Sequence, residues 1–141
     1  MQAKLFGLMV AIFGLLLTIT PVYIFPPCQE SLITVSGASV PMKCFWSGRA
    51  ELAIGLLICA GGILLIFFSS FQARLALSLL LFLACLLALA VPVFLIGGCK
   101  LETMACQMTT FPAVLVLASM TALFCLANVV YLYHQARSEN F

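Results

Sequence analysis

Four uninterrupted apolar runs dominate this sequence and leave few folds open to it. Each reaches the roughly 20 residues that an α-helix needs to cross the hydrocarbon core of a bilayer. The runs lack the apolar–polar alternation of outer-membrane strands, and a helix satisfies its own backbone hydrogen bonds in lipid. The sequence therefore predicts an all-α integral membrane protein, a four-transmembrane-helix bundle. The predicted helices cover about residues 5–25, 52–71, 75–96 and 112–133.

Composition supports a membrane location. Charged residues make up 7% of the 141 residues and hydrophobic residues 65%, whereas a soluble domain carries about 25% charged residues. The net charge of +2 is too small to indicate a nucleic-acid partner. The run after Lys4 is longer than a signal-peptide core, and no Ala-x-Ala site follows it, so we interpret it as a retained helix. We predict a single domain over residues 1–141, embedded as a multi-pass protein in the lipid bilayer of the cell membrane.

Two longer connections, residues 26–49 and 97–111, are predicted on one side of the bundle. On the other side, residues 69–74 form a very short turn, which makes the second and third helices antiparallel neighbours. Residues 30–40 are rich in β-branched and small residues, which favours a short hairpin.

The polar residues 41–51, Pro-Met-Lys-Cys-Phe-Trp-Ser-Gly-Arg-Ala-Glu, lie directly before the second apolar run. Ser47 or Gly48 is expected to cap that helix, and Glu51 suits its positive N-terminus. Both connections hold a Met-x-Cys element preceded by an earlier cysteine. This pattern predicts a bundle built from two repeated helical hairpins, with both connections on one face. The Met-x-Cys pairs are Met42 with Cys44 and Met104 with Cys106.

Cysteines decide the predicted orientation. Lysines and arginines number three on each side of the bundle, so the positive-inside rule does not indicate which side is cytoplasmic. Disulfides persist outside the cytoplasm, and four of the seven cysteines lie in the two connections. We therefore predict extracytoplasmic loops and both termini in the cytoplasm. The loop cysteines are Cys28, Cys44, Cys99 and Cys106.

Three interpretations of these loop cysteines compete. As structural disulfides, repeat symmetry favours Cys28 with Cys44 and Cys99 with Cys106, each bond adding about 2–4 kcal/mol. Redox catalysis typically uses Cys-x-x-Cys, which this chain lacks, although exposed loop cysteines can exchange disulfides. Thioether and thiolate ligands suit Cu(I), but the only histidine, His134, lies on the opposite side. We predict structural disulfides, with no metal and no cofactor. The candidate soft-metal ligands are Met42, Cys44, Met104, Cys106 and Met108.

The spans themselves carry few reactive groups. Cys59, Cys85 and Cys125 are expected to pack as small apolar residues, and Asn128 is expected to form an interhelical hydrogen bond. The sequence contains no phosphate-binding glycine loop, catalytic triad or carboxylate pair. We therefore predict a protein that is not an enzyme.

The segment Met-Lys-Cys-x-Trp-x-Gly-x-Ala-Glu leading into the second helix, with an early loop cysteine, resembles domain-of-unknown-function family 4418. Its members are small four-helix membrane proteins of bacteria and archaea. In that family the residue after the Met-x-Cys cysteine is often histidine, whereas this chain has Phe45 and Gln107. Because this imidazole ligand is missing here, the resemblance gives less reason to expect a metal or haem site in this chain. Members of this family resemble accessory proteins of ABC exporters whose permease is of the FtsX-like or MacB-like type.

From this resemblance we expect a non-enzymatic accessory subunit of a larger membrane complex, with an ABC permease as partner. Aromatic residues dominate interface energetics, although they also anchor proteins at the membrane interface. The alternative function is a membrane thiol-disulfide or soft-metal or haem-handling protein that uses the loop cysteines. The predicted partner contacts are Phe45, Trp46, Arg49 and Glu51.

Overall fold

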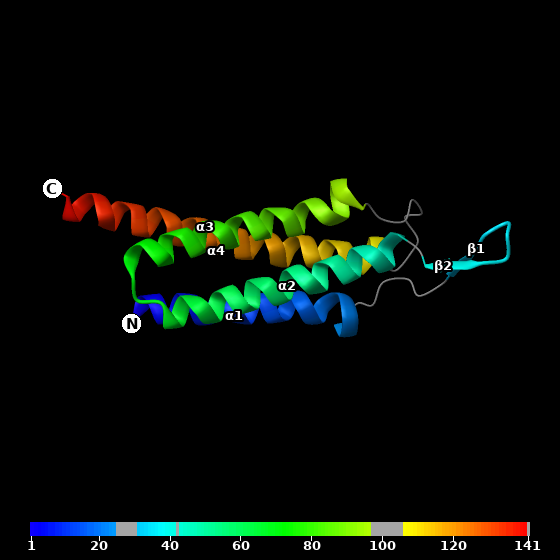
Figure 1. Cartoon of the computed structure of the whole chain (residues 1–141), viewed down its shortest axis with the longest axis horizontal. Coiled ribbons are helices and arrows are strands. Elements are labelled where there is room, and N and C mark those ends of the chain that lie inside the picture. The colour runs from blue at the N-terminus through cyan, green and yellow to red at the C-terminus, as the bar shows by residue number, and fades with distance from the viewer. Residues whose placement is uncertain (25–30, 42, 97–105, 141) are drawn as a thin grey trace.

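The computed structural model describes residues 1–24, 31–41, 43–96 and 106–140. Within these residues, four long helices run alongside one another in an elongated bundle, and both chain ends lie at the same end of it (Figure 1). All four are long and apolar enough to cross a bilayer, which confirms the predicted membrane-spanning helices. They are α1 (Gln2–Ile19), α2 (Lys43–Phe67), α3 (Phe71–Ala90) and α4 (Phe111–Glu139).

Short π-helical segments extend three of these helices at the end opposite the termini, which we call the loop end. Pro21 and Pro92 each occupy the second position of such a segment. Because proline has no backbone N–H, the regular hydrogen-bond ladder cannot continue through it and the turn widens. The segments after α1 and α3 share the pattern Pro-Val-aromatic-aliphatic. The three segments are η1 (Thr20–Ile24), η2 (Val91–Leu95) and η3 (Cys106–Thr110).

The start of α2 differs from its predicted position. The helix begins at Lys43 rather than near residue 52, and Ser47 and Gly48 are buried within it instead of capping it. Apolarity marks where a helix meets the hydrocarbon core, whereas the helix itself continues outward until Pro41 excludes it. For the same reason α4 runs to Glu139, well past the predicted limit of its apolar run.

Helices α1 and α2 pack so closely that their backbones nearly touch. A Cβ atom added to Gly62 would lie 2.5 Å from the backbone nitrogen of Ala11, and one added to Gly14 would lie 2.5 Å from that of Cys59. Glycine permits this approach because it carries no side chain. Helix α3 packs mainly on α4, although neither of these helices contains a glycine. Two tight helix pairs therefore form the bundle.

The core between the pairs holds aliphatic side chains and two thiols. Cys85 on α3 and Cys125 on α4 are both fully buried in it. Their predicted role as small packing residues is confirmed, whereas Cys59 is only partly buried. The amide Nδ2 of Asn128 donates a hydrogen bond of 2.7 Å to the Ser78 hydroxyl on α3. This contact confirms the interhelical bond predicted for Asn128.

A two-stranded hairpin projects beyond the loop end of the bundle (Figure 1). Its strands are β1 (Ser31–Ile33) and β2 (Ser39–Pro41), which pair antiparallel with Leu32 opposite Val40. Gly37 takes the left-handed backbone conformation of the turn, with φ at 80°, which a residue with a Cβ rarely adopts. The predicted hairpin is confirmed.

Candidate functional site

An aromatic and cationic cluster lies on the outward face of the first turns of α2. The rings of Phe45 and Trp46 meet edge to face, with centroids 5.9 Å apart. One helical turn later, the Arg49 guanidinium carbon lies 5.4 Å from the Phe45 ring centroid. Trp46 is 57% exposed, and Arg49 is exposed as well. We call these three residues the Trp46 patch; they bring together three of the four predicted contact residues.

Glu51, the fourth predicted contact, lies apart from this patch. Its side chain is 2% exposed, and neither carboxylate oxygen has a hydrogen-bond partner among the described residues. The hydroxyl of Ser47, one turn earlier on the same inner face, is also buried without a partner. A carboxylate in such surroundings is costly unless it is neutral or a cation meets it. Glu51 therefore faces the interior of the bundle and not a lateral surface.

The cysteine chemistry predicted for the loops falls outside the described residues. Cys28 and Cys99 lie there entirely, as do the side chains of Cys44 in α2 and Cys106 in η3. The pairings Cys28 with Cys44 and Cys99 with Cys106 stay predictions. Where the structure describes side chains, no group of three or more His, Cys, Asp and Glu residues could hold a metal ion.

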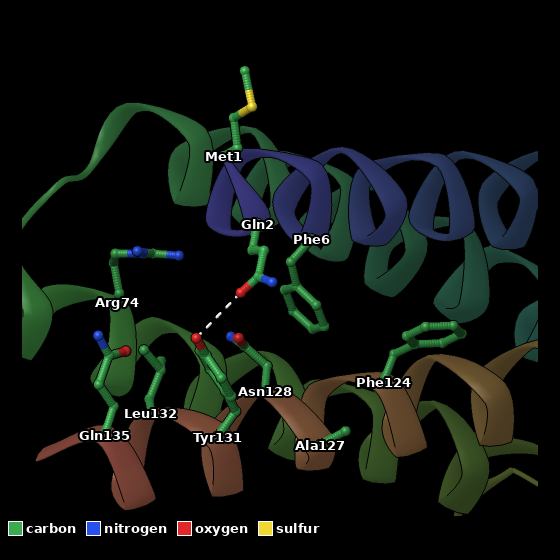
Figure 2. A pocket seen from close by; sticks show the side chains of 10 residues that line it. All are labelled: Met1, Gln2, Phe6, Arg74, Phe124, Ala127, Asn128, Tyr131, Leu132 and Gln135. Atoms are coloured by element: carbon green, nitrogen blue, oxygen red, sulfur yellow. Dashed lines mark hydrogen bonds between the residues drawn. The ribbon is translucent and has the colours of Figure 1, made fainter. Parts of the chain in front are cut away.

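A pocket of about 620 Å³ lies at the opposite end of the bundle, which we call the terminal end (Figure 2). The start of α1, the first turn of α3 and the last turns of α4 enclose it. The Tyr131 hydroxyl donates a 3.2 Å hydrogen bond to Oε1 of Gln2 across the pocket. Its lining residues are Met1, Gln2, Phe6, Arg74, Phe124, Ala127, Asn128, Tyr131, Leu132 and Gln135.

Arg74 gives this pocket its charge. Its guanidinium points into the pocket, toward the start of α1 (Figure 2), and its Nε is buried without a hydrogen-bond partner. Sequence analysis missed the pocket because Gln2, Arg74 and Gln135 are far apart in the chain. The one available signal was a lone arginine at the start of an otherwise apolar run, because ionisable residues in membrane spans usually mark functional sites.

Comparisons with known proteins identify the family of this chain without assigning it an activity. A search of curated proteins and a search of solved structures each found no match. A family model described as "Domain of unknown function (DUF4418)" matches residues 10–131, a range that includes both Met-x-Cys elements. The chain therefore belongs to the DUF4418 family, as its Met-Lys-Cys-x-Trp segment predicted.

Proposed function

We propose that this protein is a non-enzymatic accessory subunit that binds a larger integral membrane protein laterally, with an ABC permease of the FtsX-like or MacB-like type as the expected partner. The Trp46 patch is the observation that carries the proposal. Tryptophan and arginine are, with tyrosine, the residue types enriched among binding hot spots. The identity of the partner as an ABC permease rests on the family resemblance.

Two features of the patch favour binding over simple anchoring in the membrane. First, Arg49 is held over the Phe45 ring, so its guanidinium is ordered before any partner arrives, which lowers the entropic cost of binding. Second, the patch lies at the loop end, from which the hairpin extends with exposed Ile33 and Val35. These groups together present an apolar and cationic surface to a partner.

The spans leave ample area for lateral contact. In the most apolar window of each span, only 33–39% of the residues are buried inside the chain. Many of the remaining residues are exposed, large and apolar, and are available to lipid or to a neighbouring protein. A small bundle with so much outward surface is suited to packing along a larger membrane protein.

Replacing Trp46 with Ala should reduce recovery of the partner about tenfold or more, because a hot-spot side chain contributes about 2 kcal/mol or more. The measurement is purification of the tagged chain from native membranes in mild detergent, with quantitative mass spectrometry of the proteins that accompany it. Tyr23→Ala is the matched control. Tyr23 is an exposed aromatic at the loop end, 81% exposed, but no cation among the described side chains lies over its ring.

Two results would contradict the proposal. If the wild-type chain emerges without a stoichiometric membrane partner, the accessory role is wrong. If Tyr23→Ala reduces recovery as much as Trp46→Ala does, the aromatic residues act as interface anchors instead. Recovery of a permease and its ATPase with the wild type, lost selectively in Trp46→Ala, is the expected result.

We further infer that the bundle consists of two repeated hairpins with both termini in the cytoplasm and disulfide-bonded loops outside. The shared Pro-Val-aromatic-aliphatic pattern of η1 and η2 supports the repeat, as does the pairing of α1 with α2 and of α3 with α4. The cysteine distribution supports the orientation, because disulfides form outside the cytoplasm.

A membrane-impermeant maleimide applied to intact cells tests this topology. We expect the loop cysteines to react only after a reductant has opened their disulfides, because a disulfide has no free thiolate. A variant with Ser at Cys28, Cys44, Cys99 and Cys106 should remain unlabelled. Labelling without reductant would instead indicate free thiols and favour the redox or metal-handling alternative. If the loop cysteines stay unlabelled even after reduction, the loops lie in the cytoplasm and the predicted orientation is wrong.

A further inference from the structure

We propose that the pocket at the terminal end binds an anionic phospholipid, whose phosphate is held by Arg74. The proposal concerns the end of the bundle opposite the Trp46 patch and does not depend on the accessory role. It rests on an arginine in the pocket whose buried Nε has no acceptor, on the neutral polar groups around it, and on an apolar cavity beside it.

One N–H group of the Arg74 guanidinium lacks a partner among the residues that the structure describes. Nε of Arg74 is buried and donates to no acceptor, and a buried donor without an acceptor is unfavourable. A guanidinium presents paired N–H groups in a planar fork that matches two phosphate oxygens. A phosphate placed in the pocket would supply the missing acceptors and neutralise the charge.

The pocket around Arg74 suits an anion. None of the described lining residues is acidic, and the Gln2 and Gln135 amides and the Tyr131 hydroxyl project from two other helices toward the same space (Figure 2). The Tyr131 hydroxyl donates to Oε1 of Gln2, which leaves the Gln2 amide N–H groups available. Asn128 is already committed to Ser78. Arg74 and the two glutamines are therefore the groups that would hold a phosphate.

An adjoining cavity distinguishes a lipid from a free phosphate ion. This second cavity, of about 520 Å³, shares Met1 and Gln2 with the pocket and continues over Lys4 to the apolar side chains Leu5, Leu8 and Ile66. A cation followed by an apolar wall matches a lipid headgroup followed by its acyl chain. Basic pockets between transmembrane helices bind anionic headgroups in this manner.

The experiment uses delipidated, purified full-length protein and native mass spectrometry with added phosphatidylglycerol or phosphatidylcholine. We expect one phosphatidylglycerol per chain, bound at least about tenfold more tightly than phosphatidylcholine. Arg74→Gln should remove that preference. Arg137→Gln is the matched control, because Arg137 is an exposed arginine on the last turn of α4, outside the pocket. The circular dichroism spectrum and thermal transition of Arg74→Gln without lipid establish that the variant folds.

Three results would overturn the proposal. Both lipids carry a phosphate, so equal binding of the two would show that the net negative charge of the headgroup is not recognised. An equal loss of binding in Arg137→Gln would show that surface charge, and not the pocket, attracts the lipid. Inorganic phosphate that displaces phosphatidylglycerol at similar concentration would identify a free phosphate ion as the occupant. If Arg74→Gln does not fold, Gln2→Leu and Gln135→Leu should each weaken phosphatidylglycerol binding, and unchanged binding in both would also overturn the proposal.

Discussion

Replacing Gly62 with Ala should lower the free energy of unfolding by about 1–3 kcal/mol, the usual effect of forcing extra atoms into a packed interface. The added Cβ would lie 2.5 Å from the backbone nitrogen of Ala11 and 2.9 Å from its Cα. Backbone atoms of a helix cannot rotate away as a side chain can, so α1 as a whole must move. Gly62→Leu should have a larger effect and separate the two helices. The measurement is SDS-induced unfolding in mixed micelles, followed by circular dichroism.

The adjacent glycine provides a matched control. A Cβ on Gly61 would also meet an atom at 2.5 Å, but that atom is Cδ2 at the far end of the Leu81 side chain, which can adopt another rotamer. Both substitutions gain the same helix propensity, up to about 1 kcal/mol. The difference between the two variants therefore isolates the backbone contact. Equal stabilities would show that α1 and α2 do not depend on this close approach.

Replacing Glu51 with Met should raise the free energy of unfolding by about 1–3 kcal/mol, the cost of a buried polar group without a partner. Both carboxylate oxygens of Glu51 are buried and accept no hydrogen bond from any described residue. Methionine has an unbranched side chain of similar length and fills the same space without a polar atom. The same micelle unfolding experiment measures the change. Exchange of a buried ionisable group for an apolar one is often stabilising.

Glu139→Met is the control, because Glu139 is exposed in the last turn of α4 and its replacement should change stability little. A less stable Glu51→Met variant would contradict the expectation and show that the carboxylate is bound by a group or a cation in the membrane. A stabilised variant that also loses its membrane partner would assign Glu51 to function, since proteins tolerate unfavourable residues mainly at functional sites.

The long helices were predictable because their signal is local and strong. A run of about 20 apolar residues has few stable alternatives in lipid, and the β-branched residues around Val35 indicated the hairpin in the same direct way. The first turns of α2 were harder to predict. Polar residues continue a helix beyond the bilayer as readily as they form a loop, so hydropathy placed the start of α2 too late.

That boundary error also hid the position of Glu51. With the helix beginning at Lys43, Ser47 and Glu51 are four residues apart and share the inner face, whereas Arg49 lies on the outer one. Residues two apart on a helix do not share a face, but the sequence could not indicate which of Arg49 and Glu51 is buried. The Arg74 pocket was beyond prediction, because it requires knowing which helices are neighbours.

The pairing of α1 with α2 and of α3 with α4 also bears on how the chain is made. Because the first pair closes largely through its own glycine contacts, it can assemble as soon as α2 leaves the ribosome. The second pair holds its own polar contact, between Asn128 and Ser78. Each of these side chains therefore finds its partner in the adjacent helix of the same pair, without waiting for the first pair.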